Sequence, residues 1–64
     1  MTPLQAVTRY ATRITDLPGV SESDVIRHGV AMQAQCVKEH RLRAWSPVEA
    51  RLEDGVWLVW FWGL

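Results

Sequence analysis

The chain has 64 residues, with 7 Lys and Arg against 7 Asp and Glu, 4 Trp and a single cysteine, Cys36. A chain of this length forms one small domain and buries only about 60% of the surface that its unfolded form exposes, which leaves no room for a catalytic cleft between domains. One cysteine cannot form an internal disulfide, and zero net charge argues against a general nucleic-acid-binding or membrane-surface protein.

The sequence shows no targeting or membrane signal. Residues 1–5 lack a basic region followed by an apolar run, so we expect no secretory signal and a cytoplasmic location. The longest apolar run, residues 56–64, is under half of the ~20 residues that a membrane-spanning helix needs. We therefore expect no membrane partner.

The first predicted element is a helix over residues 2–17. Thr2, Pro3 and Gln5 form a capping-box pattern, with Pro3 at the first helical position. At 100° per residue one arc of this helix is apolar, and it contains Leu4, Val7, Tyr10, Ala11, Ile14 and Leu17. Pro18 and Gly19 then end the helix.

A second helix is predicted from about Glu22 to about Arg43. Ser21 and Ser23 are its candidate N-caps, and its C-terminal turn is basic, as the helix dipole favours. Gly29 inside this helix costs about 1 kcal/mol relative to Ala, which indicates a close helix–helix contact there.

The pattern changes to strands after Ser46-Pro47. Residues 48–53 alternate apolar and charged, Asp54-Gly55 is typical of a two-residue type I′ turn, and residues 56–62 form the returning strand. The sequence therefore predicts an α+β fold in the order α-α-β-β, as one domain over residues 1–64.

A two-residue turn determines the register of this hairpin. Glu53 then pairs with Val56 and Glu49 with Trp60, and directly opposed residues share a face. One face is uniformly apolar and should pack on the helices: Val48, Ala50, Leu52, Trp57, Val59 and Phe61. The other face is mixed: Glu49, Arg51, Glu53, Val56, Leu58, Trp60 and Trp62.

The mixed face indicates a binding surface, because a single helical layer leaves it without cover. Its candidate partner-binding residues are Leu58, Trp60, Trp62, Arg51 and Val56, with Lys38, Arg41 and Arg43 as a possible basic rim. Alternatively, the last strand is central in a larger sheet and this chain covers both of its faces, although two helices offer little material for a second cover. A homodimer that extends the sheet through the last strand is the expected assembly.

The candidate chemical groups favour structural roles. Cys36 and His40 are four residues apart on one helix face, which suits a metal pair or a Cys–His nucleophile, but two ligands are too few for a metal site. We expect them in the core, and we expect no enzymatic activity, no metal and no cofactor.

In size, compactness and lack of catalytic residues, the chain resembles small inhibitor proteins of phages and mobile elements, anti-CRISPR proteins among them. Residues 48–59 are also similar to the helix-then-hairpin units of NTF2-like and other small α+β domains. The first resemblance implies a non-enzymatic protein that binds and inhibits or modulates a larger host protein or complex. Two alternatives stay open: a small nucleic-acid-binding module that uses the basic end of the second helix, and an antitoxin or immunity-type partner.

Overall fold

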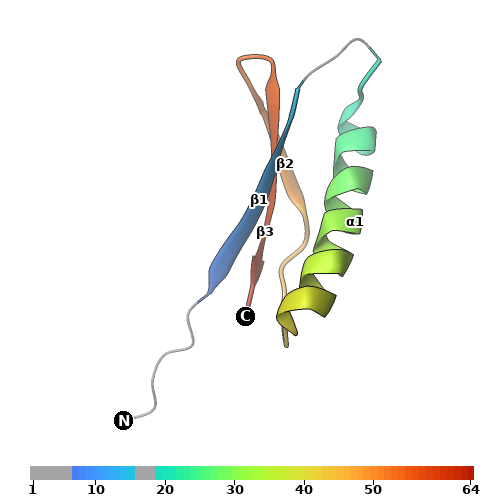
Figure 1. Ribbon diagram of the computed structural model, residues 1–64. Helices are drawn as coiled ribbons and strands as arrows, with labels where there is room; N and C mark the ends of the chain where they lie inside the picture. Colours follow the sequence, from blue (N-terminus) through green and yellow to red (C-terminus); the bar gives the residue numbers. More distant parts are fainter. Residues whose placement is uncertain (1–6, 16–18) are drawn as a thin grey trace.

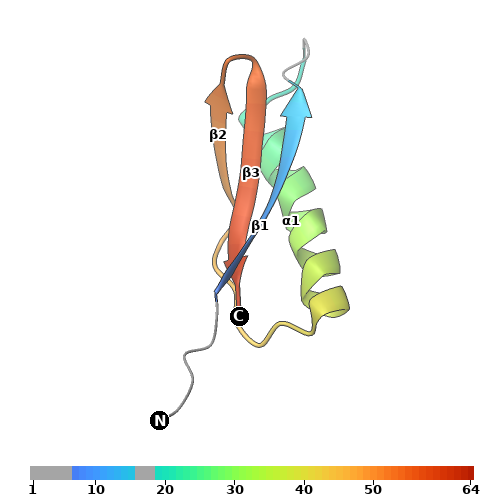
Figure 2. The same ribbon diagram turned by 60° about the vertical axis from the view of Figure 1, so that its left-hand side comes forward.

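The computed structural model describes residues 7–15 and 19–64 and contains four elements in the order β-α-β-β. They are β1 (Thr8–Thr15), α1 (Glu22–His40), β2 (Glu49–Glu53) and β3 (Val56–Gly63). The strands form one antiparallel sheet in the order β1-β3-β2, and α1 lies along one face of it (Figures 1 and 2). The fold is therefore a small α+β domain with one helix.

The predicted first helix is wrong over residues 8–15, which form β1. In this segment Tyr10, Thr12 and Ile14 are half-buried, whereas the residues between them are exposed. That alternation has the period of a strand, and β1 pairs with β3 along all eight of its residues. The predicted capping box at residues 2–5 lies outside the described residues.

The second predicted helix is confirmed as α1, with a start at Glu22 and an earlier end. Ser21 is its N-cap: the backbone N–H of Asp24 donates to Oγ of Ser21 (3.2 Å), and the backbone N–H of Ser21 donates to Oδ2 of Asp24 (3.2 Å). α1 ends at His40 instead of about Arg43, because Arg41 adopts a left-handed conformation with φ of 51° and caps the helix.

The hairpin prediction is confirmed in both its turn and its register. Asp54 and Gly55 both have positive φ, 49° and 72°, as a type I′ turn requires. The pairs run from Glu53 with Val56 to Glu49 with Trp60, as the two-residue turn predicts. The hairpin therefore presents the two faces that were assigned from the sequence.

The core lies between α1 and one face of the sheet. Its fully buried side chains are Val25 of α1 and Val59 and Phe61 of β3. The Tyr10 ring stacks on Phe61 with 5.2 Å between ring centroids. Leu52 was predicted on this inner face and shares it with Trp57, but it is 45% exposed near the hairpin turn.

Gly29 makes a close contact, as predicted, but with the sheet instead of with a second helix. A Cβ atom at this position would lie 2.5 Å from the Cγ1 atoms of both Val48 and Val59. Since no real Cβ atom tolerates such distances, the absence of a side chain lets α1 approach the sheet here.

β3 is the central strand of the sheet, so, contrary to the expectation from the sequence, the sheet cannot be extended in a homodimer through β3. β1 pairs along one edge of β3 and β2 along the other, so β3 has no free edge for a second copy over its paired residues. The third strand of the sheet comes from the segment that was predicted as the first helix. The free edges of the sheet belong to β1 and β2.

Candidate functional site: the open face of the sheet

The sheet has one face packed on α1 and a second face that no other described element covers. In Figure 2 the three strands lie in front of α1, so this second face is turned toward the viewer. We call it the open face, and the pairing register assigns to it Arg9, Ala11, Arg13, Thr15, Glu49, Arg51, Glu53, Val56, Leu58, Trp60 and Trp62. The mixed face predicted from the sequence is therefore one surface of a three-stranded sheet.

An apolar stripe runs along the middle of the open face. It consists of alternate residues of β3, namely Val56, Leu58, Trp60 and Trp62. Trp62 is 41% exposed, whereas the other three are half-buried, because side chains of β1 and β2 flank them. The open face therefore exposes less apolar surface to solvent than the hairpin alone would expose.

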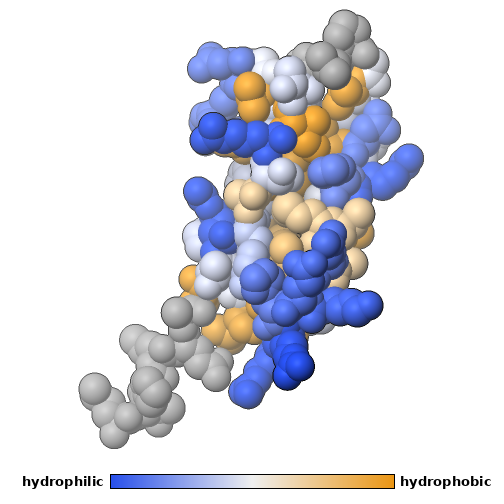
Figure 3. Space-filling model, viewed as in Figure 1, coloured by the Kyte–Doolittle hydropathy of each residue, from blue (hydrophilic) through white to orange (hydrophobic). Residues whose placement is uncertain are grey.

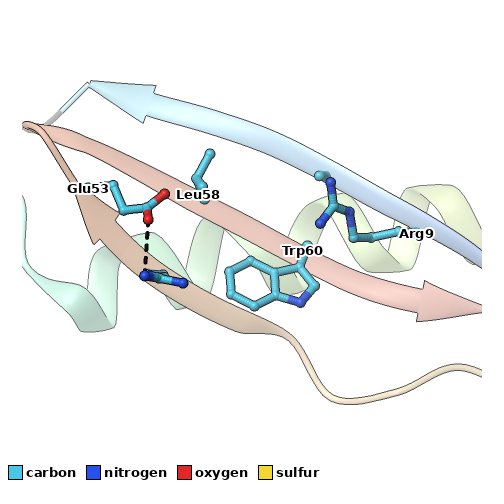
Figure 4. Close-up of a pocket in the computed structure, with 6 residues that line it drawn as sticks. Arg9, Glu53, Leu58 and Trp60 are labelled. Atoms are coloured by element: carbon cyan, nitrogen blue, oxygen red, sulfur yellow. Dashed lines mark ion pairs between the residues drawn. The ribbon is translucent and has the colours of Figure 1, made fainter.

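A groove of about 290 Å³ lies beside this stripe. Its lining residues come from all three strands: Arg9, Ala11, Arg51, Glu53, Leu58 and Trp60. Figure 4 shows Leu58 and Trp60 extending from β3 on the side away from α1, with Arg9 of β1 and Glu53 of β2 on either side. The small Ala11, which pairs with Trp60, leaves room beside the indole ring. A second hollow continues along the face past Leu58 and Val56 to Arg13 and Glu53.

The charges of the open face are divided between its two outer strands. β1 contributes only the cations Arg9 and Arg13, whereas β2 contributes Glu49, Arg51 and Glu53. Arg51 Nη2 lies 3.1 Å from Glu53 Oε1. Within residues 7–15 and 19–64, Arg9 and Arg13 have no carboxylate within ion-pair distance. Their guanidinium groups are therefore available to an anionic group of a ligand.

Ser46 holds the Trp62 end of the stripe in place. The Trp62 backbone N–H donates to Ser46 Oγ (2.8 Å), and the Ser46 N–H donates to the Trp62 carbonyl (2.8 Å). Gln33 of α1 donates from Nε2 to the Ser46 carbonyl (2.7 Å), which ties this segment to the helix. A further hollow of about 320 Å³ lies here, lined by Val7, Ala44, Trp45, Ser46, Trp62, Gly63 and Leu64.

The predicted basic rim lies elsewhere. Lys38 is in the last turn of α1, and Arg41 and Arg43 follow that helix; all three are exposed. α1 packs on the face opposite Trp60, so the basic helix end is not beside the groove (Figure 1). Arg51, by contrast, lines the groove as the predicted rim of the apolar stripe.

Arg9 and Arg13 were not predicted in the site. Both fall outside the apolar arc of the helix predicted over residues 2–17, whereas β1 places them on the open face. The signal that could have located them is the alternation in residues 8–15, where Thr, Tyr and Ile favour a strand and the two arginines are four residues apart.

The prediction that Cys36 and His40 lie in the core is wrong for His40, which is exposed, and Cys36 is not among the buried residues. Cys36 is only partly buried, and burial together with the nearby Glu39 raises the pKa of its thiol. His40 is exposed and its ring packs against Tyr10, with 5.0 Å between centroids. Among the described residues, no group of three His, Cys, Asp or Glu side chains is placed to hold a metal ion.

On the side seen in Figure 3, charged and polar side chains interrupt the apolar patches. In residues 7–15 and 19–64, no helix is both long enough and apolar enough to cross a bilayer.

Comparison of the chain with protein-family models, with curated proteins and with solved structures finds no match.

Proposed function

We propose that this chain is a non-enzymatic protein-binding module that inhibits or modulates a larger protein by docking through the open face. The observation that supports this proposal is the apolar stripe of β3, because no described element of the chain covers it. Trp and Arg are the residue types most enriched among interface hot spots, and both line the groove at Trp60, Arg9 and Arg51.

The groove suits a partner with an apolar side chain beside an acidic one. The apolar side chain would lie against Trp60 and Leu58, and the acidic group would meet the guanidinium of Arg9, which has no ion pair among the described residues. A fully buried Trp side chain covers about 150–250 Å², and docking would remove from water the part of Trp60 and Trp62 that is still exposed, which favours binding.

Nucleic-acid binding through the basic helix end is the weaker candidate. Arg41 and Arg43 follow α1, whereas Trp60 lies on the opposite face of the sheet. A single nucleic-acid strand on one flat surface could therefore not stack its bases on the stripe and also contact these two arginines. An antitoxin or immunity-type role would use the same surface as the leading proposal and would differ in the identity of the target.

The test is a pull-down from a candidate host, followed by mass spectrometry. The double variant Trp60→Ala/Trp62→Ala removes the indoles of the stripe. Val30→Ala is the control, because Val30 is an apolar side chain that is 50% exposed on α1, which packs on the face of the sheet opposite Trp60 and Trp62. We expect the wild type and the control to retain the same protein and the double variant to lose it. Equal retention by all three would refute the proposal, and capture that falls steeply with salt and requires Arg41 and Arg43 would favour nucleic acid.

A further inference from the structure

β1 offers a long free edge to a further strand. It pairs with β3 along all eight of its residues, and among the described residues no other backbone–backbone hydrogen bond involves β1 (Figure 2). An edge strand directs the N–H and C=O groups of alternate residues away from its sheet, where an extended peptide can pair with them. β2, the other edge strand, has only five residues. β1 is therefore the longer of the two places where a strand can be added.

The side chains of β1 on the open face favour an acidic strand. Arg9 and Arg13 stand four residues apart, and neither has a carboxylate within ion-pair distance in residues 7–15 and 19–64. Directly opposed side chains of antiparallel strands have their Cβ atoms about 4.5–5.5 Å apart. Two carboxylates four residues apart on an added strand would therefore meet both guanidinium groups. The small Ala11 stands between them and lines the groove, so a large apolar residue opposite Ala11 can extend over the sheet.

The helix side of the same edge offers an apolar hollow of about 230 Å³. The described residues that line it are Ile14 of β1, Val20, and Asp24, Val25 and His28 of α1, with none from β3 or β2, so the hollow lies at the β1 side of the sheet. Successive side chains of an added strand alternate between the two faces. Those that do not meet the arginines are thus directed toward α1, and an apolar one opposite Ile14 would enter this hollow.

A second copy of this chain does not supply such a strand. Residues 8–15 contain no Asp or Glu, so β1 paired with another β1 places no carboxylate opposite either arginine in any register. β2 carries two glutamates at the right spacing, but Arg51 stands between them and pairs with Glu53. In β2 a third guanidinium would thus take the place of the apolar residue, between Arg9 and Arg13. Charged side chains of this kind protect an edge strand from self-pairing and leave it free for a different partner.

We infer that the partner adds an extended segment to the β1 edge as a fourth strand, with two acidic residues opposite Arg9 and Arg13 and an apolar residue opposite Ala11. This inference rests on the proposed function and names the segment that the partner contributes: acidic, apolar and acidic residues at every second position, with apolar residues between them that face α1. Backbone hydrogen bonds along β1 supply affinity, and the alternate side chains supply specificity. The fourth strand widens the open face, so the groove at Trp60 belongs to the same interface.

Synthetic peptides test this inference. The first probe has the core Glu-Val-Leu-Val-Glu between Thr residues and a fluorescent label, and its anisotropy is measured as the full chain is added up to about 1 mM. A second peptide carries Lys in place of both Glu residues. Two further peptides keep the Glu core and carry backbone N-methyl groups, one at the Glu and Leu positions and the other at the Val positions. In a strand beside β1, the N–H groups of only one of these two sets face β1.

We expect the chain to bind the Glu peptide and to bind the Lys peptide at least about tenfold more weakly. Arg9→Glu/Arg13→Glu should reverse this preference. Lys38→Glu/Arg43→Glu, at the basic end of α1, makes the same change in charge and should keep it. All four positions are exposed, and circular dichroism checks that each variant folds.

The N-methylated peptides separate a paired strand from docking through side chains alone. One set should abolish binding and the other should leave it, because only one set removes hydrogen-bond donors to β1. Equal effects of the two sets, or no binding of the Glu peptide, would overturn the inference. So would wild-type dimers in sedimentation velocity that the Glu peptide dissociates, because a second copy would then occupy the β1 edge.

These outcomes are separable from the partner test. Loss of a host protein from Trp60→Ala/Trp62→Ala, together with peptides that fail to discriminate, would refute the fourth strand and keep the proposed function. Peptide results as expected, with capture that does not depend on these two tryptophans, would do the reverse.

Discussion

The two faces of the sheet show how one strand can serve both folding and binding. On the inner face of β3, Val59 and Phe61 are completely buried against α1. On the open face, the neighbouring Leu58 and Trp60 are only half-buried, and Trp62 is exposed. Because successive side chains of a strand point to opposite faces, stability and binding are separated by a single residue step. A run of apolar residues in one strand can thus alternate between positions that form the core and positions that are open to a partner.

The largest expected effect separates the neighbouring residues Phe61 and Trp62. Phe61→Ala empties a fully buried position and should lower the free energy of unfolding by about 3–5 kcal/mol, enough to unfold much of a domain of this size. Trp62→Ala on the open face should cost under about 1 kcal/mol. Urea denaturation followed by circular dichroism measures both, and similar losses for the two variants would contradict the division between faces.

The second prediction tests the close approach of α1 to the inner face. Gly29→Ala should destabilise the fold by about 1–3 kcal/mol, although Ala is the better helix former, because its Cβ would collide with Val48 and Val59. Adding Val48→Ala removes one of the two colliding methyl groups and should recover part of the loss when thermal unfolding is measured. A gain in stability from Gly29→Ala alone would show that the helix can move away from the sheet.

The third prediction concerns the N-terminus of α1, the helix that covers the inner face of the sheet. Ser21→Ala should cost about 1 kcal/mol, because it removes the acceptor for the Asp24 N–H. Hydrogen bonds from Ser21 lower the pKa of Asp24 below its ordinary value of 3.8. Stability from this carboxylate is therefore present above that value and is lost as pH falls through the lowered pKa. Thermal unfolding from pH 7 to pH 2 should show a smaller acid loss in Ser21→Ala; an unchanged loss would argue against the capping box.

The smallest expected effect on stability lies on the open face. Arg51 and Glu53 form an exposed ion pair, so Arg51→Ala should change the free energy of unfolding by under about 0.5 kcal/mol. The same variant should weaken association through the groove that Arg51 lines. Denaturation of the variant and a pull-down with the captured protein check both parts. A large loss of stability would show that the open face supports the fold as well.

The sequence predicted the parts of the fold that local signals determine. Asp54-Gly55 specified the turn, and the turn determined every pair of the hairpin, while Ser21 marked the start of α1. Residues 8–15 were mistaken for a helix because Val7, Tyr10, Ala11 and Ile14 satisfy the helical period as well, and Thr suits either face of a strand. Their pairing partner is about 50 residues away in β3, and local periodicity carries no information about such a contact.

The site was predicted only in the part that the hairpin contributes. Leu58, Trp60, Trp62 and Arg51 followed from the register. Arg9 and Arg13 come from β1, and once that segment was interpreted as a helix, they had no reason to lie near Trp60. The alternative in which the last strand is central is correct for its position in the sheet. The same alternative predicted that this chain covers both faces of the sheet, and this part is wrong for the described residues, because none of their elements covers the open face.

The indole N–H signals of the four tryptophans test the central claim most directly, because these residues lie at three different places in the structure. Trp60 and Trp62 lie on the open face, Trp57 on the inner face, and Trp45 between α1 and β2. In ¹H–¹⁵N correlation spectra recorded as a captured partner is added, the account predicts that the signals of Trp60 and Trp62 shift while that of Trp57 stays in place. Shifts confined to Trp45 and Trp57 would contradict it.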